Sequence, residues 1–157
     1  MNGKVVAGAI VLSGLVAGAA LWYLQVYGFY EPIEAASPAA AIRLTPVAGK
    51  PEEIIVAGFQ GIDADSSPLR FRGCFTTPTA LATLTETYQV YDNPTPLIAP
   101  GWFDCFDAGQ LTEDLATGAA VAFLSEANIH QGVDRVVAVY PDGRAYAWHQ
   151  LNESAEN

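Results

Sequence analysis

The chain has 157 residues, of which 51% are hydrophobic, and seventeen acidic residues oppose seven basic ones for a formal net charge of −10. A chain this acidic is not suited to bind nucleic acid or anionic lipid headgroups, because like charges repel. About 100 residues remain for a compact part after the apolar N-terminal stretch and the segment behind it, which is enough for one hydrophobic core.

The most informative segment is 5–24, VVAGAIVLSGLVAGAALWYL, which contains no charge, proline or amide side chain. About 20 apolar residues in a helix span the roughly 30 Å hydrocarbon core of a bilayer. A cleaved secretory signal is the alternative, with 17–19 as its cleavage site, but its apolar region is typically only about 7–15 residues long. Trp22, Tyr23 and Tyr27 also cluster at one end, as in an interfacial aromatic belt. We therefore predict a cytoplasmic tail over 1–4 and an uncleaved transmembrane helix over 5–27.

The charges that flank this segment predict its orientation. Lys4 precedes it, whereas Glu31 and Glu34 follow it, and the first basic residue on that side is Arg43. The positive-inside rule therefore places the N-terminus in the cytoplasm and the C-terminal domain on the outer side.

Small residues line one part of the apolar segment. Gly14 and Gly18 form a GxxxG motif, which Ser13 and Ala17 extend. Such a face lets a second helix approach closely, although small residues are common in membrane helices in any case. A lone anchor does not need this face, so we interpret it as a site where a helix of a larger integral membrane protein packs.

Four prolines, at positions 32, 38, 46 and 51, and a run of alanines follow the predicted helix. This composition predicts an extended tether over 28–51. Beyond it, apolar and alternating patterns predict strands over 53–59 and 69–75, with a polar loop over 60–68 between them.

The remaining elements have clearer local signals. Thr77 and Pro78 predict the start of a short helix, and Asp107 and Gly118 bracket a second one over 108–117. A strand is predicted over 119–124, and Pro141-Asp142-Gly143 predicts a hairpin between 133–140 and 144–151. The expected fold class is α+β, with an antiparallel sheet and two short helices over 52–152 and a polar tail over 153–157.

The two cysteines, Cys74 and Cys105, are 31 positions apart in similar aromatic surroundings. Outside the cytoplasm such a pair can form a disulfide, and the alternative is two buried thiols that do not meet. Both interpretations are compatible with the sequence, and the disulfide is the one we expect.

No motif in the sequence indicates catalysis. There is no GxSxG elbow, phosphate-binding loop, GxGxxG or CxxCH, and His130 and His149 have no metal-ligand spacing with each other or with the cysteines. We therefore predict a protein that is not an enzyme, with no cofactor and no metal site. Trp102, Phe103 and Asp104 form a candidate docking surface, although aromatic residues in a small domain more often belong to its core.

Several longer motifs resemble a known group of proteins. They are IDADSSPLRFR (62–72), CFTTP (74–78), PTPL (94–97), APGWFDCF (99–106) and AWHQ (147–150). Together with the apolar helix they resemble a family of uncharacterised single-span membrane proteins from alphaproteobacteria. Some members carry a histidine-kinase label, which this chain does not support, since it lacks the phospho-acceptor helix and the ATP-binding glycine motifs. The resemblance implies a bacterial inner-membrane protein with a periplasmic C-terminal domain.

These features lead to two functional hypotheses. The first is a non-catalytic accessory subunit of an inner-membrane complex, of which respiratory complexes are the leading candidates, with a basic soluble cytochrome as a further partner. The alternative is a periplasmic assembly factor or metal chaperone for a respiratory oxidase, in which both cysteines would be reduced ligands.

Overall fold

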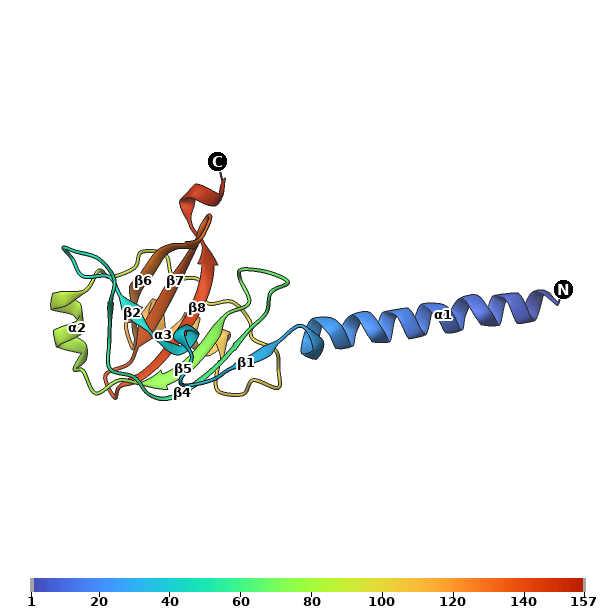
Figure 1. The fold of residues 1–157 in the computed structure, drawn as a ribbon, viewed down its shortest axis with the longest axis horizontal. Helices are drawn as coiled ribbons and strands as arrows, with labels where there is room; N and C mark the ends of the chain where they lie inside the picture. The colour runs from blue at the N-terminus through green and yellow to red at the C-terminus, as the bar shows by residue number, and fades with distance from the viewer. Residues whose placement is uncertain (1, 157) are drawn as a thin grey trace.

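A computed structural model describes residues 2–156. Its first element is the helix α1 (Gly3–Tyr23), which begins where the Asn2 side chain accepts a hydrogen bond from the Lys4 backbone N–H at 3.2 Å. A π-helical turn, η1 (Leu24–Gly28), extends it, so that Gly3–Gly28 forms 26 helical residues. This helix projects from the rest of the molecule (Figure 1), and none of its most apolar window is buried. By length and composition it is sufficient to cross a membrane.

A six-stranded antiparallel sheet forms the centre of the domain, with the order β1-β4-β5-β8-β7-β6 (Figure 1). Its strands are β1 (Glu31–Ile33), β4 (Ala57–Asp63), β5 (Arg72–Thr76), β6 (Val121–His130), β7 (Val133–Val139) and β8 (Arg144–Leu151). Two short strands, β2 (Arg43–Leu44) and β3 (Glu52–Glu53), pair separately. The helices are α2 (Leu81–Thr87) and α3 (Ala108–Thr117), with single turns η2 (Pro38–Ala40) and η3 (Glu153–Glu156). The α+β architecture predicted from the sequence is therefore confirmed.

Both faces of the sheet are covered, and β7 is buried along its whole length. Alternate residues of β7 point to opposite faces, so Val137 and Val139 join one hydrophobic cluster and Val136 and Ala138 join the other. The first cluster also contains Leu84 of α2, and the second contains Leu111 of α3. The helices thus help to seal opposite faces of one sheet.

The helix α3 and the last hairpin form where the sequence predicts them. Asp107 caps α3 by accepting a hydrogen bond from the Gln110 N–H at 3.0 Å, and Gly118 ends it with a φ of 77°. The other short helix begins at Leu81, later than the Thr77-Pro78 signal predicts. The strand expected over 53–59 is replaced by β3 and β4, and β4 runs into the predicted loop because it pairs with β1 and β5 at once.

The prediction of an extended tether over 28–51 is wrong for most of its length. β1 is an edge strand of the main sheet, and Pro32 is tolerated there because β1 pairs only with β4. Further along, Ile42 and Leu44 are 1% and 0% exposed and belong to the first hydrophobic cluster. The domain therefore begins at Glu31, three residues after the helical segment ends at Gly28. In the predicted polar tail, 153–156 forms the turn η3, and residue 157 lies outside the described residues.

Candidate functional site at the junction of helix and domain

The best-defined site in the structure is the junction where the apolar helix meets the sheet domain. Trp102 stacks on Tyr27 of the helical segment, with ring centroids 6.0 Å apart and planes 18° from parallel. Its indole Nε1 donates a hydrogen bond to the Val26 carbonyl at 2.6 Å. Tyr30 contacts the same indole edge-on at 5.9 Å. Trp102 therefore fixes the domain to the end of the helix by stacking and by a directional bond.

Arg70 makes a second connection across the junction. Its Nη1 donates a hydrogen bond to the Gln25 carbonyl at 3.0 Å, and its guanidinium lies 5.3 Å from the centre of the Tyr30 ring. Carbonyl groups at the C-terminal end of a helix lack intrahelical donors and carry partial negative charge, so a cation is favourable there.

Arg72, on β5, shapes the loops that face the helix. It is buried, and its guanidinium donates hydrogen bonds to the carbonyls of Leu97 and Ile98 in one loop and of Leu69 and Phe71 in the other. Burial lowers the pKa of Arg72 to about 10, so the side chain remains charged near neutral pH. One buried cation thus holds both junction loops in position.

A disulfide between Cys74 and Cys105 also holds the loop that carries Trp102, with the two Cα atoms 6.3 Å apart. Cys74 lies on β5 and Cys105 lies three residues after Trp102, so the bond ties this loop to an internal strand of the sheet. The expected disulfide is confirmed, and the two-thiol alternative is wrong.

The three residues of the candidate docking surface have different environments. Trp102 is engaged by the helix, Phe103 is half-buried against the second hydrophobic cluster, and Asp104 is exposed. The free aromatic surface that the sequence suggested is therefore partly occupied by the chain's own helix. Docking of a partner at Asp104 and its surroundings stays a prediction.

The small residues of the predicted helix-packing face, Ser13, Gly14, Ala17 and Gly18, are all exposed. Ser13 donates a hydrogen bond to the Ile10 carbonyl at 2.9 Å, as hydroxyls in apolar helices often do. A Cβ atom added at Gly14 or Gly18 would have no atom within 4 Å beyond the adjacent backbone of the helix itself. Packing of a partner helix on this face stays a prediction.

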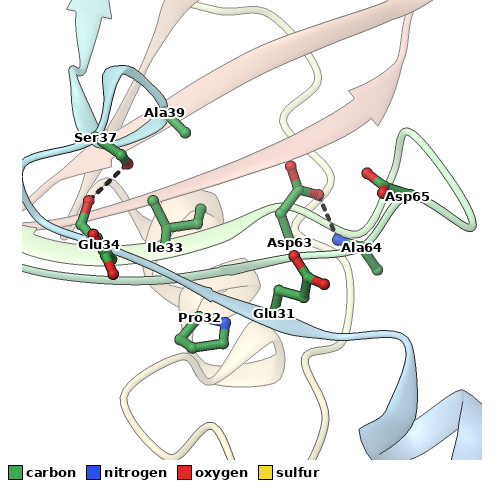
Figure 2. A pocket seen from close by; sticks show the side chains of 9 residues that line it. All are labelled: Glu31, Pro32, Ile33, Glu34, Ser37, Ala39, Asp63, Ala64 and Asp65. Carbon is green, nitrogen blue, oxygen red and sulfur yellow. Dashed lines mark hydrogen bonds between the residues drawn. The ribbon is translucent and has the colours of Figure 1, made fainter.

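An acidic pocket of about 440 Å³ lies between β1 and the end of β4 (Figure 2). Glu31 and Asp63 are paired across the two strands, Asp65 follows on the next loop, and Glu34 lies at the other end beside Ser37. Asp63 accepts a hydrogen bond from the Ala64 N–H at 2.8 Å, and burial raises the pKa of its carboxyl group. The pocket provides negative potential close to the helix, but residues 2–156 contain no group of three or more His, Cys, Asp or Glu side chains placed to hold a metal ion.

A buried polar stack, which we did not predict, lies near this pocket. The guanidinium of Arg135 lies 4.0 Å from the centre of the Phe71 ring, and the imidazole of His149 stacks on the same ring with centroids 4.7 Å apart. Arg135 Nε also donates to His149 Nε2 at 3.0 Å, and His130 packs edge-on against His149 at 5.7 Å. The predicted hairpin could have indicated that Arg135 and His149 are neighbours, because its register pairs these two residues.

A family model matches the larger part of the chain. No curated protein and no solved structure matches the chain. The family DUF6446, described as a family of unknown function, matches residues 42–157, which include most of the sheet domain. The match begins at Ile42, after α1 and β1. The chain therefore belongs to the DUF6446 family of unknown function.

Proposed function

We propose that this chain is a non-catalytic accessory subunit of a bacterial inner-membrane complex, with its N-terminus in the cytoplasm and its sheet domain in the periplasm. The observation that carries the proposal is the fixed junction. The Trp102–Tyr27 stack, two hydrogen bonds to helix carbonyls and the early start of β1 mount the domain directly on the helix. A rigid connection between helix and domain is suited to a subunit that holds its domain over a neighbouring protein. A domain that must reach for ligands would instead need a flexible linker.

The exposed helix also supports this proposal. None of its most apolar window is buried, and it projects from the sheet domain (Figure 1), so this surface is available to lipid or to another helix. The GxxxG face has open space at both glycines and therefore suits close packing against a larger membrane protein.

The charge of the domain supports a basic partner. All seventeen acidic residues but only six of the seven basic ones follow α1, so the outer part has a formal charge of −11. Such a field attracts basic soluble proteins, which is the reason to propose a respiratory complex that receives a basic cytochrome. The alphaproteobacterial resemblance supports the same setting.

Affinity purification from native membranes in mild detergent, with a tag after Asn157, tests the proposal. We expect the subunits of one membrane complex to copurify in stoichiometric amounts with the parent chain. Gly18→Ile should reduce this recovery several-fold, because the added side chain obstructs the flat helix face, while its Cβ meets no atom within 4 Å beyond the adjacent helix backbone.

Gly8→Ile is the matched control. At about 100° per residue, Gly8 lies roughly 120° around the helix from Gly14 and roughly 80° from Gly18, outside the Ser13–Gly18 face. An added Cβ there also has nothing within 4 Å. Recovery should therefore equal that of the parent chain. Purification of the parent without any larger membrane protein would rule out the subunit proposal.

The disulfide weighs against the metal-chaperone alternative. That hypothesis requires reduced Cys74 and Cys105 as ligands, whereas their sulfur atoms are bonded to each other. A stoichiometric copper or zinc content in the purified full-length protein would favour the chaperone over the subunit.

A further inference from the structure

The loop that carries Trp102 lies at a defined height along the apolar helix. Its indole bonds to the Val26 carbonyl, and Arg70 bonds to the preceding carbonyl of Gln25. The uninterrupted apolar run ends at Leu24, so at 1.5 Å per residue these contacts are only about 3 Å beyond it. The headgroup layer on each side of a bilayer is roughly 6 Å thick. If the helix spans a membrane, the loop is therefore within the headgroup layer.

The composition of this loop fits such a position. Residues 94–103 (PTPLIAPGWF) contain no charged side chain. Ile98 is 84% exposed, the largest fraction of any large hydrophobic residue in the described part of the chain. A neighbouring hollow between helix and loop contains Arg70 and Arg72, and none of its eleven lining residues is acidic. An isoleucine this exposed is costly in water but favourable at the boundary of headgroups and acyl chains.

We propose that the 97–102 loop is a second membrane contact, in which Ile98 inserts into the bilayer interface beside the helix. The occupant of this apolar surface is lipid, because the surface is continuous with the lipid-facing side of the helix through Tyr27 and Trp102. The inference rests on the membrane anchor of the proposed function. It adds that the domain lies on the membrane surface in one orientation, with Arg70 among the headgroups.

Nitroxide labelling of the full-length chain in phosphatidylcholine vesicles tests this contact. Single labels are attached at Ile98→Cys, at Ile55→Cys as an exposed position remote from the junction, and at Val16→Cys within the helix. Ile55 is 67% exposed and precedes the end of β4 farthest from β1. The collision rate of each label with oxygen and with a water-soluble nickel chelate reports its depth.

For each label, the measured quantity is the ratio of its collision rate with oxygen to its collision rate with the nickel chelate. We expect this ratio to be several-fold higher at 98 than at 55. Equal ratios at 98 and 55 would overturn the inference. The same result is expected if Ile98 binds a protein partner instead of lipid, because the vesicles contain no partner protein. A water-like ratio at 16 would instead refute the membrane anchor itself. Each variant is compared with the parent by thermal unfolding, so that misfolded protein is recognised.

Discussion

At the scale of single residues, His149 is a buried side chain whose two ring nitrogen atoms both have hydrogen-bond partners. Its Nδ1 lies 2.7 Å from the Pro68 carbonyl and acts as the donor, while Nε2 accepts the bond from Arg135. This assignment uses both nitrogen atoms of a neutral imidazole. Burial, and then the charge of Arg135, lower the pKa of His149 to about 3. A proton on Nε2 would remove the acceptor that orients Arg135.

This pKa predicts an acid-sensitive domain. The unfolded imidazole titrates near 6.5, so between that pH and about 3 the unfolded chain binds a proton that the folded chain does not. The contribution of His149 to stability is therefore complete above pH 6.5 and falls by up to about 1.4 kcal/mol per pH unit below it. Denaturant unfolding at pH 7, 6 and 5, followed by tryptophan fluorescence, measures the slope.

Comparison with His149→Gln isolates this contribution, since Gln keeps an acceptor for Arg135 but does not titrate. We expect a flatter dependence of unfolding free energy on pH in this variant. Burial raises the pKa of Asp63, so this residue changes the unfolding free energy with pH in the direction opposite to His149. Asp63 is present in both proteins and therefore does not affect the comparison. His130→Gln controls for the loss of one exposed histidine. Equal slopes for His149→Gln and the parent would contradict the assignment.

At the scale of elements, the disulfide compensates for the lack of regular structure between α2 and α3. This segment contains three prolines, at positions 94, 96 and 100, so little of it can form a ladder. Replacing both Cys74 and Cys105 by alanine should lower the free energy of unfolding by about 3–4 kcal/mol in the chain-entropy estimate for a loop of this length. Denaturant unfolding of the oxidised parent and the double variant measures it.

The same double variant should expose the loop more than the sheet. We expect faster amide hydrogen exchange over 98–106. Strand β7 is buried along its length, so its rank among the strands in protection from exchange should not change. The reduced parent protein should behave like the double variant, which separates loss of the bond from loss of the side chains. Unchanged exchange over 98–106 would mean that Arg72 and the contacts of Trp102 hold the loop without the disulfide.

Local signals explain which elements could be predicted. Asp107 and Gly118 define α3 because a side-chain cap and a left-handed glycine act within one turn of the helix. Pro141-Asp142-Gly143 likewise defines the last hairpin. In these cases the chain neighbours themselves supply the stabilising contacts, so sequence alone was sufficient.

Contacts between distant segments explain what was missed. The stretch around Ile42 and Leu44 has the composition of a linker, and its burial depends on β6, from which the Leu124 carbonyl accepts the Thr45 N–H at 2.9 Å. The junction is similar, because Trp102 and Val26 are 76 positions apart. Sequence reasoning identified aromatic residues on both segments as interfacial or docking residues, but no local pattern records that they meet.

At the scale of the whole molecule, the structure combines a bare helix with a domain held at its end. The helix contributes no residue to either hydrophobic cluster, so the domain does not depend on it for a core. Its orientation depends on the short connection to β1 and on the contacts of Trp102 and Arg70. Folding of the domain and its orientation relative to the helix are thus separable properties.

Trp102→Ala tests this separation. The stack and the hydrogen bond together contribute about 2 kcal/mol, so their loss should lower the ratio of docked to undocked domain by roughly thirtyfold. Because Trp102 lies outside both clusters, the domain should unfold at nearly the parent temperature. Spin-label distances between Val16→Cys in the helix and Ile55→Cys in the domain should form a broader distribution than in the parent.

Trp102→Phe distinguishes the two contributions, because it retains a ring for Tyr27 but removes the N–H that reaches the Val26 carbonyl. Its distance distribution should be intermediate between those of the parent and the alanine variant. A distribution in Trp102→Ala as narrow as in the parent would show that β1 pairing and Arg70 suffice to orient the domain. The orientation of the domain would then depend on the backbone of 29–33 and on Arg70, and the aromatic residues at the junction would not be needed for it.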